Sequence, residues 1–310
     1  MDRELDVLSN YRAINNKLKK RLLKKPNFAE ASDQFGTLTR VLKQQECLQY
    51  AGFCCIAKAH CQNALNNPVA ETEALVEAAR LFFKAEKENV DVKCPAFEEH
   101  LTEATHCFNQ AIKIYKREGH LALAAMISLE VGNKLREVGK IQEACDHFIR
   151  AAEIQRSYSI IDYLHSTREG ITCRIMTGDY HSALKMLSEL STIIEAYEKK
   201  EPFILVSQRE FICSCEIDKV FLLLLLQSSP QQLSSAYGKV MEKYIWENLE
   251  DSRPAWLQEE LFQLLQSLIM AVQEKDTELL KELENDLFPF LKGWQCQIYF
   301  DLINSLNQVD

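Results

Sequence analysis

Glycine and proline are scarce in this sequence, and their scarcity excludes an all-β fold. Among 310 residues there are 9 glycines and 7 prolines, about 3 % and 2 % against an average usage of roughly 7 % and 5 %. An all-β chain of this length needs a turn rich in these residues about every ten positions. The hydrophobic fraction of 47 % and the charged fraction of 26 % are typical of a globular protein. The sequence therefore predicts an all-α fold.

Long apolar runs and targeting signals are also lacking. The most apolar stretch, 220–226, has seven residues, whereas a membrane-spanning helix needs about twenty. The first residues are charged and lack the apolar core of a signal peptide, and Asp2 stands where myristoylation needs glycine. We therefore expect a cytoplasmic protein with no direct membrane insertion.

No pattern in the sequence indicates a catalytic, cofactor or metal site. The few glycines form neither a phosphate loop nor a dinucleotide fingerprint, and no histidine has a serine or cysteine nearby in a nucleophile elbow. Cys54, Cys55 and Cys61 with His60 come nearest to a metal cluster, but on a helix they do not share one face. Free thiols at apolar helical positions behave as small buried hydrophobes. We therefore expect buried free cysteines, no cofactor, no metal and no enzymatic activity.

The charge is unevenly distributed along the chain. The formal net charge is −9, which argues against nucleic acid as a partner, because a polyanion needs a basic surface. Residues 1–26 nevertheless carry eight basic and three acidic side chains, whereas residues 242–286 carry twelve acidic and four basic ones. Such asymmetry usually concerns partners rather than fold.

Two charged segments are therefore candidate partner-binding patches. The first is an amphipathic helix with a cationic face, whose basic residues are Lys17, Lys19, Lys20, Arg21, Lys24 and Lys25. From the acidic segment we single out Glu259, Glu260, Glu274 and Asp276. For the cationic face, an acidic protein surface, anionic lipid, RNA and plain solvent are the alternatives. The apolar stretch 221–226 is either buried in the core, which we favour, or covered by a partner.

A repeat of about 40 residues runs through the middle of the chain. Side chains recur with the spacing i, i+4, i+7 of one helix face, at Ala104, Phe108 and Ala111, at Ala144, Phe148 and Ala151, and at Ala183, Leu187 and Leu190. Gly132 lies twelve residues before Ala144, and a turn glycine lies five residues before both Ala144 and Ala183. This order is typical of a tetratricopeptide hairpin. The sequence thus predicts a tetratricopeptide-like helical-hairpin solenoid, with helices longer than in the usual repeat of about 34 residues.

We expect a single solenoid over 1–310 with three parts. A basic N-terminal helix occupies 1–27, tetratricopeptide-like hairpins occupy 28–200, and C-terminal helices with the acidic segment occupy 201–310. Glycine, proline and asparagine interrupt the helical pattern between the elements. The predicted helices cover about 4–24, 28–43, 45–65, 69–89, 96–118, 120–138, 140–157, 160–177, 179–199, 203–227, 230–249, 255–273, 275–291 and 294–307.

Several strings of residues point to a known family. In the N-terminal half they are Asn16-Lys17-Leu18-Lys19-Lys20-Arg21, Gln45-Glu46-Cys47-Leu48 and Glu77-Ala78-Ala79-Arg80-Leu81-Phe82. In the C-terminal half they are Glu242-Lys243-Tyr244, Glu259-Glu260-Leu261-Phe262 and Gln273-Glu274-Lys275-Asp276. With these strings the sequence resembles the 40-kilodalton huntingtin-associated proteins, also called factor VIII intron 22 proteins, over about residues 10–280.

The resemblance implies a solenoid without enzymatic activity whose main partner is huntingtin, a large protein of HEAT repeats that encloses it. It also implies recruitment of huntingtin to early endosomes by an endosomal Rab GTPase, with altered attachment of endosomes to the cytoskeleton. We therefore expect a cytoplasmic adaptor with a fraction on early endosomes and another in the nucleus. Some members carry a long low-complexity insert where this sequence has only 197–208, so no role of such an insert is expected here.

The alternative function is that of another tetratricopeptide adaptor, of the type that attaches membrane-fusion ATPases to their substrates. Such an adaptor would sediment with fusion complexes and bind through the concave face of its solenoid. The huntingtin partner would instead enclose the chain. These two binding modes discriminate the two functions.

Overall fold

The computed structural model describes residues 2–19, 26–94, 97–198, 208–226, 238, 243–244 and 257–307. Within these ranges the chain forms α-helices and short 3₁₀ segments but no strand, which confirms the predicted all-α fold. The chain divides into two compact units, Met1–Ser166 and Thr167–Asp310. The single solenoid over 1–310 and its boundaries near 27 and 200 stay predictions.

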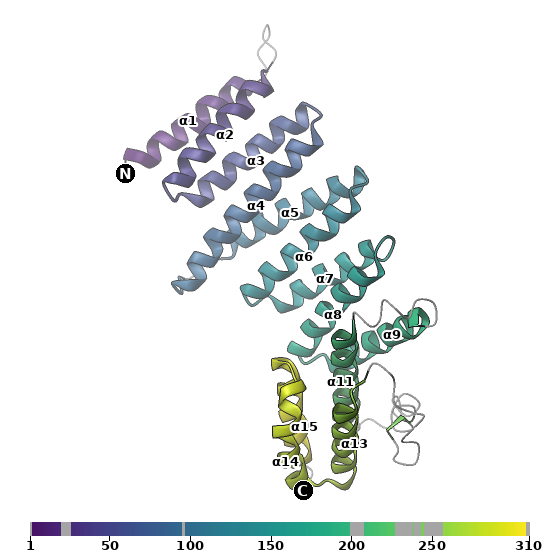
Figure 1. Cartoon of the computed structure of the whole chain (residues 1–310). Coiled ribbons are helices and arrows are strands. Elements are labelled where there is room, and N and C mark those ends of the chain that lie inside the picture. Colours follow the sequence, from purple (N-terminus) through teal and green to yellow (C-terminus); the bar gives the residue numbers. More distant parts are fainter. Residues whose placement is uncertain are drawn as a thin grey trace. The chain divides into compact units, whose positions relative to one another are not determined.

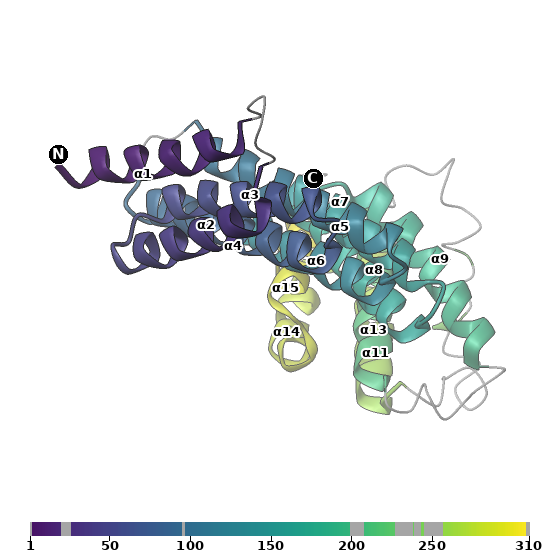
Figure 2. The ribbon, with the colours of Figure 1, turned by 90° about the horizontal axis from the view of Figure 1, so that it is seen from above.

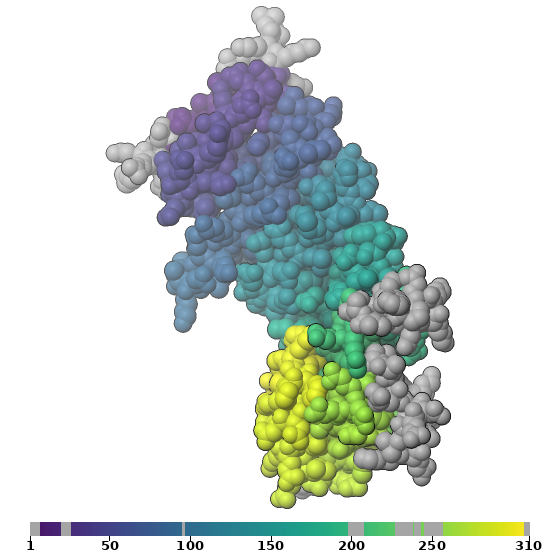
Figure 3. Space-filling model, in the orientation of Figure 1, coloured from purple at the N-terminus to yellow at the C-terminus, as the bar shows by residue number. Residues whose placement is uncertain are grey.

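The first unit is a series of helices joined by short turns (Figure 1). Its members are α1 (Asp2–Leu18), α2 (Phe28–Gln44), α3 (Leu48–Ala64), α4 (Pro68–Asp91), α5 (Glu99–Arg117), α6 (Leu121–Glu137), α7 (Ile141–Gln155) and the start of α8 (Ile160–Met176). Each helix from α2 to α6 packs on the next one along the chain. Figure 2 shows α2, α4 and α6 following one another on one side of the unit. In the space-filling view, side chains close the gaps between these ribbons (Figure 3).

Polar caps begin two of these helices where the sequence predicts breaks. Asn27 Oδ1 accepts a hydrogen bond from the backbone N–H of Glu30 at 3.2 Å, and Asn67 Oδ1 accepts one from Ala70 at 3.2 Å. Each bond satisfies a donor that the first turn of a helix leaves unpaired. Pro68 fills the first position of α4, where its missing N–H has no cost.

Glycines end several helices as predicted. Gly119, Gly139 and Gly178 follow α5, α6 and α8 with φ angles of 79°, 80° and 74°, the left-handed conformation that costs glycine least. After α2, α3, α4 and α13 the same conformation falls on Glu46, Asn66, Lys93 and Lys275. Glycine therefore marks only some of the left-handed helix ends.

The predicted repeat positions form the core. Each of the following side chains has a relative exposure of 0 %: Ala104, Phe108, Ala111, Ala144, Phe148, Ala151, Ala183 and Leu187. Because alanines let two helices approach and a phenylalanine fills the space beside them, this order packs one helix on its neighbours at close range. The spacing i, i+4, i+7 thus identified the buried face of α5, α7 and α9 (Tyr180–Glu198).

Two glycines allow a phenyl ring to touch the backbone of a neighbouring helix. A Cβ atom added to Gly132 would lie 2.8 Å from Cε1 of Phe148. A Cβ atom added to Gly52 of α3 would lie 2.8 Å from Cζ of Phe82 in α4. An alanine stands four residues before Phe82 and another three residues after it. The repeat pattern therefore extends further toward the N-terminus than the sequence analysis recognised.

The second unit is built around α11 (Arg209–Leu225). Its other helices are the rest of α8, α9, α13 (Glu259–Glu274), α14 (Thr277–Leu287), η3 (Phe288–Phe290) and α15 (Gly293–Asn307). The side chains of 220–224 are between 0 and 4 % exposed. Helices α9, α13 and α15 pack on α11, which confirms the core interpretation for 221–224.

Most observed helices agree with the predicted ones within a few residues. Helix α1 ends at Leu18 rather than near residue 24. The predicted helix 275–291 is divided, because α14 ends at Leu287 and Pro289 lies in the 3₁₀ helix that follows. The predicted helix 230–249 lies outside the described residues except at 238 and 243–244.

Candidate interaction site

The cationic face of the N-terminal helix is partly described. Lys17 and Lys19 are exposed at the end of α1. The other predicted members lie outside the described residues: Lys20, Arg21, Lys24 and Lys25. Ile14 of α1 is 8 % exposed and packs in one cluster with Phe35 of α2 and Cys61 of α3. This apolar contact holds the helix in place, and both described lysines remain exposed.

The ammonium group of Lys17 already contacts α2. Its Nζ donates to Oε1 of Gln34 at 3.2 Å and lies 3.7 Å from Oε1 of Glu30. More than half of each side chain in the ion pair with Glu30 is exposed, so the pair contributes between about 0 and 1 kcal/mol. A carboxylate of a partner can replace Glu30 at small cost, and docking through this face stays a prediction.

The acidic candidates lie at both ends of α13. Glu259 and Glu260 are exposed in its first turn, and Glu274 is exposed in its last turn. Because 16 helical residues extend over about 24 Å, the two ends present separate patches. Asp276 is exposed, but its Oδ1 accepts two backbone N–H groups at the start of α14, at 3.1 and 3.0 Å. Asp276 is therefore a helix cap, and its carboxylate is only partly available to a partner.

Ion pairs connect α4 with α6. Nε and Nη2 of Arg80 donate to the two carboxylate oxygens of Glu130 at 2.7 and 2.8 Å. Two turns further along the same helices, Nζ of Lys87 lies 3.1 Å from Oε2 of Glu137. The hydrogen bonds that Arg80 donates to Glu130 raise the pKa of Arg80. The guanidinium of Arg80 binds both carboxylate oxygens, so this ion pair fixes the orientation of the two side chains as well as pairing their charges.

A polar groove lies between α2 and α4. Its volume is about 430 Å³, and Arg40, Thr37 and Lys58 are among the residues that line it. At its edge Nζ of Lys43 lies 2.8 Å from Oε1 of Glu77. The α2, α4 and α6 side of the first unit therefore carries alternating charges that pair between neighbouring helices.

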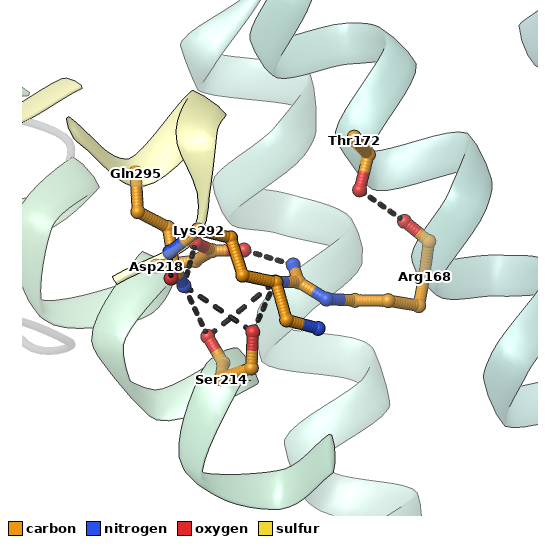
Figure 4. Close-up of polar contacts among 6 residues, drawn as sticks. All are labelled: Arg168, Thr172, Ser214, Asp218, Lys292 and Gln295. Atoms are coloured by element: carbon orange, nitrogen blue, oxygen red, sulfur yellow. Dashed lines mark hydrogen bonds and ion pairs between the residues drawn. The ribbon is translucent and has the colours of Figure 1, made fainter. Parts of the chain in front are cut away.

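A buried ion pair joins α8 to α11 in the second unit (Figure 4). Arg168 Nη1 donates to Oδ2 of Asp218, and Nη2 donates to Oγ of Ser214 at 2.9 Å. The two charged side chains are 6 % and 0 % exposed. Burial disfavours the charged guanidinium, but Asp218 outweighs this effect and the pKa of Arg168 is raised. The guanidinium of Arg168 therefore stays charged inside the protein.

Gln295 joins the start of α15 to this ion pair (Figure 4). Its Nε2 donates to Oδ1 of Asp218 at 2.7 Å and to the carbonyl oxygen of Ser214 at 3.0 Å, while its Oε1 accepts the backbone N–H of Lys292 at 2.8 Å. Each polar group of the amide is used, as a buried polar network requires. The network is internal and connects three helices, so we assign it to stability rather than to chemistry.

The cysteines of α3 are buried thiols. Cys54, Cys55 and Cys61 are at most 1 % exposed and form no disulfide. Burial raises the pKa of Cys54 and that of Cys55 to about 12, so neither forms the thiolate that attacks substrates or binds metals. Among the described residues no cluster of His, Cys, Asp and Glu is suited to a metal ion. None of the helices in the described ranges has the length and apolarity to cross a membrane.

The sequence analysis missed the ion pairs that join distant helices. Arg80 and Glu130, like Arg168 and Asp218, are 50 residues apart, and no local spacing relates them. No local signal singles out Asp218, because it stands in the charged stretch Glu216-Ile217-Asp218-Lys219. Neither its burial nor its partner was therefore predictable from the sequence.

The first unit thus has the architecture of a helical-hairpin binding protein, with a buried small–large–small repeat and an ion-paired polar side. The family model of soluble NSF attachment proteins, SNAP, matches residues 22–190, which is more than half of the chain. The class of the protein is therefore that of SNAP-like helical-hairpin proteins, in agreement with the predicted tetratricopeptide-like fold.

Within this class, the sequence is similar to two proteins named 40-kDa huntingtin-associated protein. The one from Mus musculus is 34 % identical over 342 aligned positions, which cover 94 % of this chain and 90 % of the relative. The one from Rattus norvegicus is 33 % identical with the same coverage. The chain belongs to the family of 40-kDa huntingtin-associated proteins, as the resemblance indicated.

Proposed function

We propose that this protein is a non-enzymatic adaptor that forms a stable complex with huntingtin. The observation that carries the proposal is the identity of 34 % over 94 % of the chain with a relative whose name states huntingtin association. Similarity over nearly the whole chain favours a shared partner more than a short shared motif would. The described charged surfaces support it, since complementary charges on two proteins give specificity and fast association.

We propose that the complex with huntingtin determines where the protein acts in the cell. Bound to huntingtin, the adaptor couples it to early endosomes through an endosomal Rab GTPase and alters how endosomes attach to the cytoskeleton. The protein itself is proposed to be cytoplasmic, with a fraction on early endosomes and another in the nucleus. Neither nucleic acid nor a cofactor takes part.

The first test is complex formation between purified components. The full chain is mixed with huntingtin from the same organism and passed over a sizing column, with an unrelated HEAT-repeat protein as the control. We expect co-elution with huntingtin near one-to-one and no co-elution with the control. If the chain elutes at the volume of its free form in both mixtures, the proposal is refuted.

The cationic face of α1 is tested within the same complex. We expect the double variant Lys17→Glu/Lys19→Glu to weaken binding at low salt and to differ less from wild type as the salt concentration rises. The matched control is Lys113→Glu/Lys116→Glu, which makes the same change of charge at exposed positions of α5. Equal affinity of wild type and the α1 variant at low and moderate salt would refute docking through this face.

A second candidate function is attachment of a membrane-fusion ATPase to its substrate. The match of 22–190 to the SNAP model is the observation that favours it. Co-sedimentation of the chain with fusion complexes, in the absence of huntingtin, would support this function. Failure to sediment with them, together with binding to huntingtin, would exclude it.

A further inference from the structure

A groove of about 400 Å³ lies between α4 and α6 in the first unit. Four cationic side chains line it: Arg80, Lys84, Lys87 and Lys134. Phe83 and Val138 supply its apolar lining. The groove therefore combines positive charge along its edges with an apolar lining, a combination that the chain's net charge of −9 does not lead one to expect.

The two carboxylates of the groove neutralise only half of its cations. Glu130 is engaged by the fork of Arg80, and Glu137 is engaged by Lys87. These pairs leave a net charge of +2 from Lys84 and Lys134, which is concentrated on facing helices. A ligand that enters the groove consequently meets two cations whose charge the groove itself does not balance.

The remaining cations are accessible to a ligand. Lys84 is two-thirds exposed, and its Nζ lies 4.0 Å from Oε1 of Glu88. Nζ of Lys134 lies 5.8 Å from the centre of the Phe83 ring, and in the described part of the chain no carboxylate pairs with it. A cation held over an aromatic face is fixed in position, so Lys134 presents its charge next to the apolar lining.

We propose that this groove binds an acidic helical segment of the protein partner, with an apolar side chain of that segment seated against Val138. The proposal rests on the proposed function as an adaptor and names the chemistry of its contact. Lys84 of α4 and Lys134 of α6 both line the groove, so two carboxylates of one partner helix can each meet one of these cations.

A net charge of only +2 distinguishes this ligand from a polyphosphate or nucleic acid. Such polyanions bind through many cations and carry little apolar surface, so they leave the apolar lining at Val138 uncovered. A helix with two carboxylates matches the charge and covers the apolar lining. We therefore favour the protein segment, and the polyanion becomes an outcome of the test.

The test uses the full chain and a probe of known sequence. The probe is a synthetic helical peptide with glutamates at i and i+7 and a leucine between them. Its control has glutamines in place of the glutamates. The variant is Lys84→Glu/Lys134→Glu, and its matched control is Lys113→Glu/Lys116→Glu on α5. A second variant, Lys84→Gln/Lys134→Gln, keeps the test available if charge reversal disturbs folding.

We expect both groove variants to bind the acidic peptide at least about tenfold more weakly than wild type, and the α5 control to remain within about twofold. Equal binding by wild type and groove variants would overturn the proposal. So would equal binding of the two peptides, or a groove-dependent affinity for a single-stranded RNA that exceeds that for the acidic peptide. If huntingtin fails to bind while the peptide binds in a groove-dependent manner, the proposed partner is wrong and the groove's chemistry stands.

Discussion

The two units of this protein are stabilised in different ways. In the first unit, buried alanines and phenylalanines pack at close range and the ion pairs lie at the surface, as with Arg80, whose side chain is 53 % exposed. In the second unit, an ion pair lies inside the core, with Arg168 at 6 % and Asp218 at 0 % exposure. The first unit depends on contacts between successive helices, and the second depends on polar contacts between helices far apart in the chain.

This difference gives the two units different sensitivities. An apolar repeat loses packing when one side chain is shortened, and the loss is graded by the size of the cavity. A buried ion pair fails more abruptly, because removal of one partner leaves a charge without hydration. All three tryptophans lie in the second unit, so tryptophan fluorescence follows that unit alone while circular dichroism follows both.

The largest effect is expected from Asp218→Ala. It leaves the guanidinium of Arg168 buried and unpaired, at a cost of about 3–5 kcal/mol in the free energy of unfolding. The measurement is denaturant unfolding followed by tryptophan fluorescence, with Glu274→Ala on the surface of α13 as the control. The double variant Arg168→Met/Asp218→Leu should recover much of the loss. If the single variant unfolds at the same denaturant concentration as wild type, the pair does not stabilise the unit.

Phe148→Ala is expected to cost a similar amount, about 3–5 kcal/mol, because it opens a cavity where the ring was fully buried. The loss should appear in circular dichroism and leave the fluorescence transition in place. If the circular dichroism and fluorescence transitions shift together, the two units unfold as one. The proposed difference in how they are stabilised would then be wrong.

His147 is expected to make the stability of the first unit depend on pH. Its side chain is 6 % exposed with no hydrogen-bond partner for Nδ1, and burial, with a contribution from Arg150, lowers its pKa to about 4. The unfolded chain binds a proton near pH 6.5, before the folded one does, so stability falls as the pH drops from about 6.5 to 4. The total is roughly 3 kcal/mol.

The check for His147 is a comparison of pH profiles by circular dichroism. Subtracting the profile of His147→Gln from that of wild type isolates this residue from the carboxylates that titrate in the same range. A difference that is flat between pH 4 and 7 would contradict a buried neutral imidazole.

The smallest effects come from two glycines and should have opposite signs. Gly132→Ala places a methyl group against the ring of Phe148 and should cost about 1–3 kcal/mol. Gly36→Ala has nothing within 4 Å of the added carbon, so it should stabilise α2 by about 0.4–1 kcal/mol. The melting temperatures of the two variants measure both effects. If both variants are destabilised by the same amount, the close contact with Phe148 is not the reason that residue 132 is glycine.

The core of the first unit could be predicted from the sequence more fully than the buried ion pair of the second unit. It was predictable because Ala144, Phe148 and Ala151 repeat the spacing of a helix face. The turns at Gly119, Gly139 and Gly178 were readable because glycine accepts a left-handed backbone. The left-handed turns at Lys93 and Lys275 were not, since backbone hydrogen bonds close these helix ends and an exposed lysine side chain does not reveal them.

The candidate binding surfaces were less predictable. Charge counting found Lys17 and Lys19, which the structure places toward solvent, but it treated the acidic residues of α13 as one surface. It also missed the groove between α4 and α6, because Lys84 and Lys134 come together only when two helices 50 residues apart lie side by side. Electrostatic patches formed by residues from two different helices depend on the fold. They produce no periodic pattern in the sequence by which they could be predicted.

The network of Arg168, Asp218 and Gln295 also bears on how this family varies in length. Its members are contributed by α8, α11 and α15, which are far apart in the chain. The alignment with the relative from Mus musculus extends over 342 positions although this chain has 310 residues, so the relative contains residues that this chain lacks. Doubling the length of a connecting segment costs only about 0.6 kcal/mol in closure entropy. A buried tie between the helices themselves leaves such segments free to lengthen or shorten during evolution without loss of the unit they connect.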